Sequence, residues 1–228
     1  MDAVFSNFDE YLRAFGLTLL LFLVSGIASL IWGTILAVFR VGPVAILQRA
    51  AALYVTLFRN TPLLMIFIFM AVAMPKLGYN FRFIEDVEVA GWNISAFFVR
   101  SSIALTLYTS AFVCEAIRSG VNAVPLGQAE ASRAIGLTFA QSMRLVVVPQ
   151  ALRAVVPPLT SVQVALVKNT SVAAAFGMAE ATATMRAFTN NNADQRIGIF
   201  LAFAIGYIVI VEVVAMSSYV LERRWKVA

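Results

Sequence analysis

The amino-acid sequence predicts an all-α membrane protein, and two observations support that prediction. Hydrophobic side chains make up 61% of the 228 residues and charged ones only 13%, whereas globular domains average about 45–50% apolar and 25% charged residues. The apolar residues also form long continuous runs, and they do not alternate with polar residues as the strands of a membrane barrel do. Because backbone polar groups inside a bilayer must be paired within the membrane-embedded structure, we expect a single domain of spanning helices over residues 1–228.

A bilayer crossing needs about 20 mainly apolar residues, and about five segments of the sequence meet that requirement. The first is uncharged and is followed by Gly42-Pro43, the second contains Arg59, and the fourth is interrupted by Pro157-Pro158. We expect these two prolines to mark a discontinuity in the helix. The predicted spans cover residues 14–39, 50–74, 95–117, 154–176 and 197–221.

Five spans place the two termini on opposite faces of the membrane, so the distribution of Lys and Arg predicts the orientation. With the N-terminus outside and the C-terminus in the cytoplasm, ten basic residues fall on the cytoplasmic side and six outside. This orientation places the loop of residues 118–148 in the cytoplasm.

The residue inventory argues against most enzyme and metal chemistry. Cys114 is the single cysteine and histidine is absent, so neither a disulfide nor a cysteine-built zinc site is expected, and the commonest general base is missing. The net charge of +5 comes from basic residues that flank apolar segments, which is typical of topology determinants and not of a nucleic-acid surface. We therefore expect neither an enzyme nor a metal site.

The loop between the third and fourth spans contains the most informative motif, EASRAIG at residues 130–136. Pro125-Leu126-Gly127 ends the preceding helix, and residues 129–134 are short side chains or strong helix formers. Glu130 is expected in the first turn, where the helix dipole favours a carboxylate, and Gly136 as the terminator. Such a helix either docks on a partner as a rigid knob or rests on lipid headgroups.

Several motifs resemble those of one family. EAIRSG at 115–120 and AVPLGQAEA at 123–131 are similar to the polar amino acid subgroup of ABC importer permeases, of the glutamate, glutamine and histidine permease type, whose EAA loop matches the motif above. RNTPLL at 59–64, VPQAL at 148–152 and LVKNTS at 166–171 agree with the same family. The resemblance extends over nearly the whole chain. Ser132 departs from the family by replacing the second Ala of EAA, a change between two small residues.

The resemblance implies a type I ABC importer permease fold and a permease subunit of an ATP-driven, binding-protein-dependent importer. It implies polar amino acids as substrate, glutamate or a related acidic or amide amino acid first. Helices would rock between two openings, coupled to partner ATPases through Gln128, Glu130, Ala131, Ser132, Arg133 and Gly136.

The partners implied by the resemblance are a second permease subunit, identical or a sister chain, two ATP-binding subunits, an extracellular substrate-binding protein and the lipids of a bacterial cell membrane. ATP and Mg would bind the partner ATPases and no cofactor this chain, which contains no GxxxxGK[ST] phosphate loop.

Candidate residues for a substrate pathway lie within the spans. Ionisable residues there are costly and therefore functional candidates, although Glu115, Lys168 and Glu212 can equally form ion pairs or snorkel. Ser102, Thr106, Ser110 and Cys114 follow one helical face and either line a polar cavity or let helices pack closely. The predicted pathway comprises Thr106, Ser110, Cys114, Glu115, Thr160, Ser161, Gln163 and Lys168.

Arg59, Thr61 and Pro62 are predicted to have a gating or structural role, with simple positive-inside anchoring as the alternative for Arg59. An ion-coupled secondary transporter or channel subunit is the alternative function, with Glu115, Lys168 and Glu212 as an ion route. It should show an inverted repeat, which the sequence does not display. A membrane-embedded enzyme is disfavoured by the lack of a nucleophile and base pair.

Overall fold

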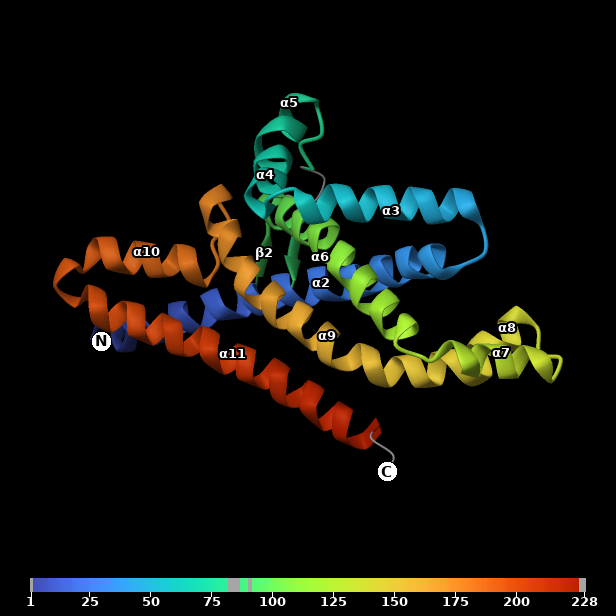
Figure 1. Ribbon diagram of the computed structural model, residues 1–228. Helices are drawn as coiled ribbons and strands as arrows, with labels where there is room; N and C mark the ends of the chain where they lie inside the picture. Colours follow the sequence, from blue (N-terminus) through green and yellow to red (C-terminus); the bar gives the residue numbers. More distant parts are fainter. Residues whose placement is uncertain (1, 82–86, 90–91, 226–228) are drawn as a thin grey trace.

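The computed structural model describes residues 2–81, 87–89 and 92–225, and nearly all of them are helical (Figure 1). Four of the described helical segments are long and apolar enough to cross a membrane, and a bent helix pair adds a fifth. The predicted all-α class with about five spans is confirmed. Helices α7 and α8 lie at one end of the bundle, whereas α10 and the N-terminus lie at the other end (Figure 1).

The chain begins with the short helix α1 (Asp2–Ser6) and the long helix α2 (Phe8–Val41). With 34 residues, α2 is about 50 Å long, and it extends beyond the predicted span because Asp9 and Glu10 occupy a favourable first turn. A Cβ on Gly33 would lie 2.6 Å from the Cβ of Val113. Only glycine therefore permits α2 to approach the third span this closely.

The second predicted span is not one straight helix. Helix α3 (Ala45–Asn60) is followed by α4 (Leu63–Ile68), the π-helical turn η1 (Phe69–Ala73) and α5 (Met74–Lys76), and the two parts meet at an angle of 100°. Thr61 is extended, with φ −92° and ψ 125°, as expected for a residue that precedes a proline. The break follows from Thr61-Pro62, a consequence that hydrophobicity alone does not reveal.

A short antiparallel hairpin lies in the polar connection before the third span. Strand β1 (Val87–Val89) pairs with β2 (Trp92–Ile94), with Glu88 opposite Asn93. Residues 82–86 and 90–91 of the connection between the predicted second and third spans fall outside the described residues. The hairpin is an addition to the all-helical prediction. Helix α6 (Ala96–Asn122) follows it and is capped by Ser95, whose hydroxyl accepts a hydrogen bond from the Phe98 N–H.

The region after α6 forms α7 (Leu126–Ala134), α8 (Phe139–Ser142), the π-helical turn η3 (Met143–Val147), α9 (Val148–Asn169) and the 3-10 helix η4 (Thr170–Phe176). The expected discontinuity at Pro157-Pro158 is wrong, because α9 continues through both prolines. Neighbouring groups satisfy the freed carbonyls of such prolines in membrane helices. The helix instead changes its winding at Thr170 and ends at Gly177, which has φ +88°.

The last elements are α10 (Ala181–Asn191), the turn η5 (Ala193–Gln195) and α11 (Arg196–Trp225). Glu180 caps α10 and is completely buried. Its carboxylate accepts bonds from the Thr182 N–H at 2.8 Å, the Ala183 N–H at 3.1 Å and the Tyr207 hydroxyl at 2.7 Å. Thr18 on α2 also contacts it. This single side chain thereby joins α2, α10 and α11.

Candidate functional site

Helix α7 is a short exposed helix that joins the third span to the fourth. Two of its flanking apolar residues are largely exposed, Leu126 at 80% and Ile135 at 78%. Gln128, Glu130, Ala131 and Arg133 lie at the surface of this helix as well. The helix already starts at Leu126, before the helix-forming residues 129–134, so Glu130 lies beyond the first turn and the predicted dipole contact is wrong. Exposed apolar side chains on a helix outside the spans are typical of a docking surface.

The end of α7 has a defined geometry. Gly136 has φ +88°, its N–H donates to the carbonyl of Arg133 at 2.9 Å, and the N–H of Leu137 donates to the carbonyl of Ser132 at 3.1 Å. These two bonds form a Schellman motif, which requires a left-handed residue that is usually glycine. The structure therefore confirms Gly136 as the terminator of the helix.

Ser132 is the buried residue of this helix and is only 3% exposed. Its hydroxyl lies 2.8 Å from the carbonyl of Ala129 and 2.8 Å from the hydroxyl of Ser142 in α8. Thr138 begins α8 with a capping box to Gln141. Ser132 thus lies on the face of α7 that contacts α8, whereas Gln128, Glu130, Ala131 and Arg133 are exposed. The result is a small, rigid block made of α7 and α8.

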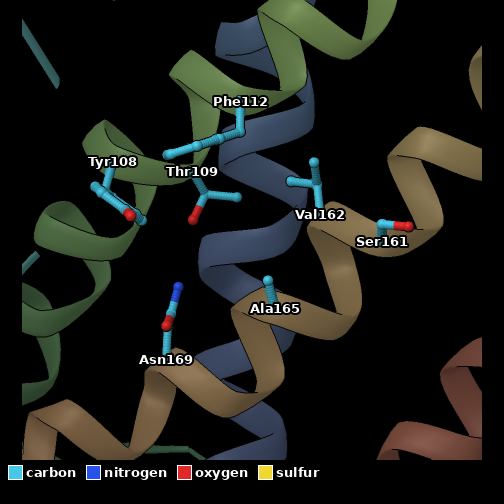
Figure 2. Close-up of a pocket in the computed structure, with 7 residues that line it drawn as sticks. All are labelled: Tyr108, Thr109, Phe112, Ser161, Val162, Ala165 and Asn169. Carbon is cyan, nitrogen blue, oxygen red and sulfur yellow. The ribbon is translucent and has the colours of Figure 1, made fainter. Parts of the chain in front are cut away.

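A cavity of about 230 Å³ lies between α6 and α9. In Figure 2, Thr109 of α6 and Asn169 of α9 point toward one another, whereas Ser161 points away from α6. Among the described residues, the side chains of Tyr108, Thr109 and Asn169 make no hydrogen bond to another protein group, so their polar atoms are available to a ligand. The cavity is lined by Tyr108, Thr109, Phe112, Ser161, Val162, Ala165 and Asn169.

Of the residues predicted for the pathway, Ser161 lines this cavity. Thr160 donates to the carbonyl of Val156, Lys168 is exposed, and Gln163 lines a separate crevice with residues of α2 and α11. Sequence reasoning missed Tyr108, Thr109, Phe112 and Asn169. Their helical spacing, 108 and 112 on one helix and 161, 165 and 169 on the other, is the signal that could have found them.

The polar stripe on α6 lies in helix packing. Ser110 shares a 2.9 Å hydrogen bond with the Tyr54 hydroxyl of α3, and Cys114 is fully buried against residues of α2 and α3. Ser102 is buried, and Thr106 is half-buried and lies outside the cavity. Small polar residues therefore allow close helix contacts here.

Glu115 is the centre of an ion cluster that joins three helices. Its carboxylate pairs with Arg40 at the end of α2, with Arg118 of α6 at 3.0 Å and with Arg59 of α3 at 3.6 Å. The Arg59 guanidinium also lies over the Phe112 ring, 5.7 Å from its centroid. Thr61 and Pro62 form the adjacent bend, which agrees with a structural role. Glu212 is exposed on α11, apart from this cluster.

Comparison with known proteins gives consistent results. The family described as "Binding-protein-dependent transport system inner membrane component" matches residues 29–227. The glutamate transport system permease protein GluC of Corynebacterium glutamicum is 38% identical over 205 residues, 87% of this chain and 86% of that protein. The glutamate/aspartate import permease protein GltJ of Escherichia coli strain K12 is 31% identical over 215 residues, 92% of this chain and 85% of that protein.

Solved structures show the same fold. The structure described as "Crystal structure of an amino acid ABC transporter with histidines" superposes with a TM-score of 0.83, with 24% identity and coverage of 97% of this chain and 96% of that chain. An inward-facing structure of the MetNI methionine ABC transporter gives a TM-score of 0.71, with 21% identity and coverage of 95% and 96%. The helical arrangement is therefore that of type I importer permeases.

Proposed function

Because the chain belongs to the family of binding-protein-dependent transport system inner-membrane components, we propose that it is the permease subunit of an ATP-driven importer for polar amino acids. Glutamate or a related acidic or amide amino acid is the proposed substrate, in line with the names of the relatives GluC and GltJ. The proposed partners are a second permease subunit, two ATP-binding subunits, which bind the ATP and Mg, and an extracellular binding protein.

One observation supports this proposal most strongly: the two helices that enclose the cavity are the two helices attached to the α7–α8 block. Helix α6 ends at Asn122, and three residues, 123–125, connect it to α7; α9 follows α8 through η3. The Ser132–Ser142 bond joins α7 to α8. A partner that displaces α7 would therefore move both walls of the cavity together.

The proposed orientation places α7 and α8 in the cytoplasm and α10 outside. Arg133 and Arg144 belong to the α7 to η3 region, Arg40 lies in the last turn of α2, and Arg118 lies four residues before the end of α6. An excess of Arg near one end of the spans favours the cytoplasmic side. The exposed Leu126 and Ile135 would then face the ATP-binding subunits, since ATP is available on that side.

The mechanism is an equilibrium between outward-open and inward-open arrangements of the permease pair. ATP binding biases it only if the nucleotide-bound partners interact more favourably with one arrangement than with the other. In the proposed cycle, the partners move α7, and α6 and α9 move with it. The cavity between α6 and α9 then opens alternately to the outside and to the cytoplasm. The chain itself contributes the cavity, the rigid coupling block and the helices that connect them.

The positions of the ionisable residues do not support the alternative function of an ion-coupled transporter or channel. Glu115, its central candidate, is held by three arginines. Lys168 and Glu212 are exposed on different helices, and ionisable groups of a proton relay need to approach one another.

The test is transport by the reconstituted complex. The chain, its ATP-binding subunits and its binding protein are placed in proteoliposomes, and uptake of labelled glutamate is followed with and without internal or external ATP, with glutamine, arginine and histidine as competitors. We expect uptake that requires ATP on the α7 side. Uptake at an unchanged rate without the ATP-binding subunits, driven by a proton or sodium gradient, would refute the proposal.

A further inference from the structure

The cavity between α6 and α9 has no charged residue in its lining, although an amino acid carries at least one carboxylate. Its seven residues are aromatic, aliphatic, hydroxyl or amide side chains. Transferring an unpaired carboxylate from water into such surroundings is strongly unfavourable. A ligand of this kind therefore needs a cation close to the cavity.

Arg59 is the cation that the structure brings next to this lining. Its guanidinium carbon lies 5.7 Å from the centroid of the Phe112 ring, and Phe112 is one of the lining residues. The contact is of the cation–π type, which orients a guanidinium plane without neutralising its charge. Phe112 thus connects the cavity to a positive group on α3.

The charge of Arg59 is poorly compensated within its own cluster. Glu115 is bound tightly by Arg40 and by Arg118, the latter at 3.0 Å, whereas Arg59 remains at 3.6 Å. The Arg59 side chain is 45% exposed, compared with 19% for Arg40. One carboxylate cannot neutralise three guanidinium groups, so Arg59 keeps donors for another anion.

We propose that Arg59 is a specificity-determining residue that binds a carboxylate of the substrate in the cavity between α6 and α9. This inference rests on the proposed function. The guanidinium exchanges its long contact with Glu115 for a fork of two N–H donors on the substrate carboxylate, a geometry that lysine cannot reproduce. Arg59 is placed for this role in the last turn of α3, directly before the Thr61-Pro62 bend.

The remaining lining suits the rest of a small amino acid. Tyr108 and Phe112 lie with their ring centroids 4.9 Å apart and offer π faces to an ammonium group. Thr109 and Asn169 point toward one another and supply hydroxyl and amide groups (Figure 2). The volume of about 230 Å³ lies below the roughly 300–1,000 Å³ of sites for drug-sized ligands, as expected for a smaller molecule.

The test measures equilibrium binding of labelled glutamate and glutamine to the purified permease–ATPase complex without the binding protein, whose own affinity would mask the effect. Arg59→Gln removes the charge, and Arg59→Lys keeps it without the fork. Arg49→Gln is the matched control, because Arg49 is exposed on the same helix and has no ion pair among the described residues. Assembly of each complex is checked by size exclusion.

We expect Arg59→Gln to raise Kd at least tenfold and Arg59→Lys to raise it severalfold, with Arg49→Gln unchanged. A rise for both ligands assigns Arg59 to the carboxylate on the α-carbon, and a rise for glutamate alone assigns it to the side-chain carboxylate. Either result supports the inference. If Arg59→Gln complexes do not assemble, the Kd of the Arg59→Lys complex decides between support and rejection of the inference.

Unchanged Kd values in assembled Arg59 variants would overturn the inference, and so would a wild-type complex that transports glutamate without binding it measurably. Failure of the proposed function has a different signature, because the wild-type complex would then show no ATP-dependent uptake at all.

Discussion

The Ser132 hydroxyl lies 2.8 Å from the hydroxyl of Ser142 and donates a hydrogen bond to it. This bond joins two helices that a loop of four residues, 135–138, separates along the chain. It makes the exposed helix α7 part of the same block as the start of the fourth span, so force applied to α7 would reach α9 as well as α6.

Enlarging Ser132 should uncouple this block. The side chain is almost fully buried, so Ser132→Leu would push α7 away from α8, whereas Ser132→Ala loses only a hydrogen bond worth about 1 kcal/mol. We expect Ser132→Leu to abolish ATP-driven uptake while membrane insertion is retained, and Ser132→Ala to keep most activity. Uptake in proteoliposomes is the measurement, and full transport by Ser132→Leu would contradict the coupling role.

Gly136 and Gly127 form a matched pair at the two ends of the same helix. A Cβ added at either position would meet open space, but only Gly136 has a positive φ, +88°. An L-residue in that conformation costs about 1–2 kcal/mol. Gly136→Ala should therefore lower uptake severalfold, whereas Gly127→Ala should leave it unchanged because alanine favours the helix. Equal effects of the two substitutions would show that the terminator geometry is unimportant.

Filling the cavity should block the substrate site without breaking the fold. Ala165 is exposed on the wall that α9 provides, so Ala165→Phe would occupy the cavity with little overpacking. Ala154 is exposed on the same helix and lies outside the cavity lining, and Ala154→Phe serves as its control. We expect uptake to fall at least tenfold in the first variant alone. Normal glutamate uptake by Ala165→Phe would exclude this cavity from the pathway.

The Glu115 cluster should stabilise the packing of α2, α3 and α6. Glu115→Gln removes the negative charge that three arginines share. The loss should be largest for the half-buried Arg40 and smaller for Arg59 and Arg118, whose greater exposure lets solvent screen the pairs. We expect a lower thermal unfolding temperature in detergent for Glu115→Gln, and no change for Glu212→Gln, whose carboxylate is exposed and has no ion pair among the described residues. Equal unfolding temperatures of Glu115→Gln and Glu212→Gln would show that the Glu115 cluster does not stabilise the fold.

The buried carboxyl of Glu180, which lies between two spans, predicts a pH dependence. Burial raises its pKa above the ordinary 4.5, and bonds from Tyr207 and from the Thr182 and Ala183 N–H groups oppose the rise. Because the folded state holds the proton more tightly, the stabilising contribution of Glu180 is fully present below the unfolded pKa and is lost as pH rises through the folded pKa.

Glu180→Gln removes this titration, because the amide stays neutral while its oxygen still accepts the backbone bonds. The thermal unfolding temperature of Glu180→Gln relative to the wild type should therefore rise as the pH is increased above the ordinary carboxyl pKa of 4.5. A difference in unfolding temperature that stays constant as the pH rises above that value would show that the pKa of Glu180 is not raised by folding.

Much of the fold could be predicted because its causes are local. Continuous apolar runs lead to α2, α6 and α11, and Gly136 ends α7 through its own backbone freedom. The bend at Thr61-Pro62 also has a local cause, but the continuous hydrophobicity of the flanking residues led to the prediction of one straight span. Pro157 and Pro158 led to the opposite error, because the surroundings of a helix decide whether a proline breaks it.

The site was less predictable, since it depends on which helix faces meet. Ser110 and Cys114 carry the polar groups expected of a cavity, yet they pack against α3. Phe112, an ordinary hydrophobic residue in the sequence, lines the cavity and contacts Arg59. Rotation of α6 by a fraction of a turn would exchange these roles, and periodicity does not specify that rotation.

By itself, the sequence determined that this protein lies in a membrane, that its helices are joined by a short helical block and that its motifs are those of an importer permease. Composition and local backbone preference suffice for such properties because each depends on residues close together in the chain. Only the tertiary structure decided that Arg40, Arg59 and Arg118 converge on Glu115 and that Thr109 faces Asn169 (Figure 2). Such contacts join residues of different helices, and the close packing of those helices selects their partners.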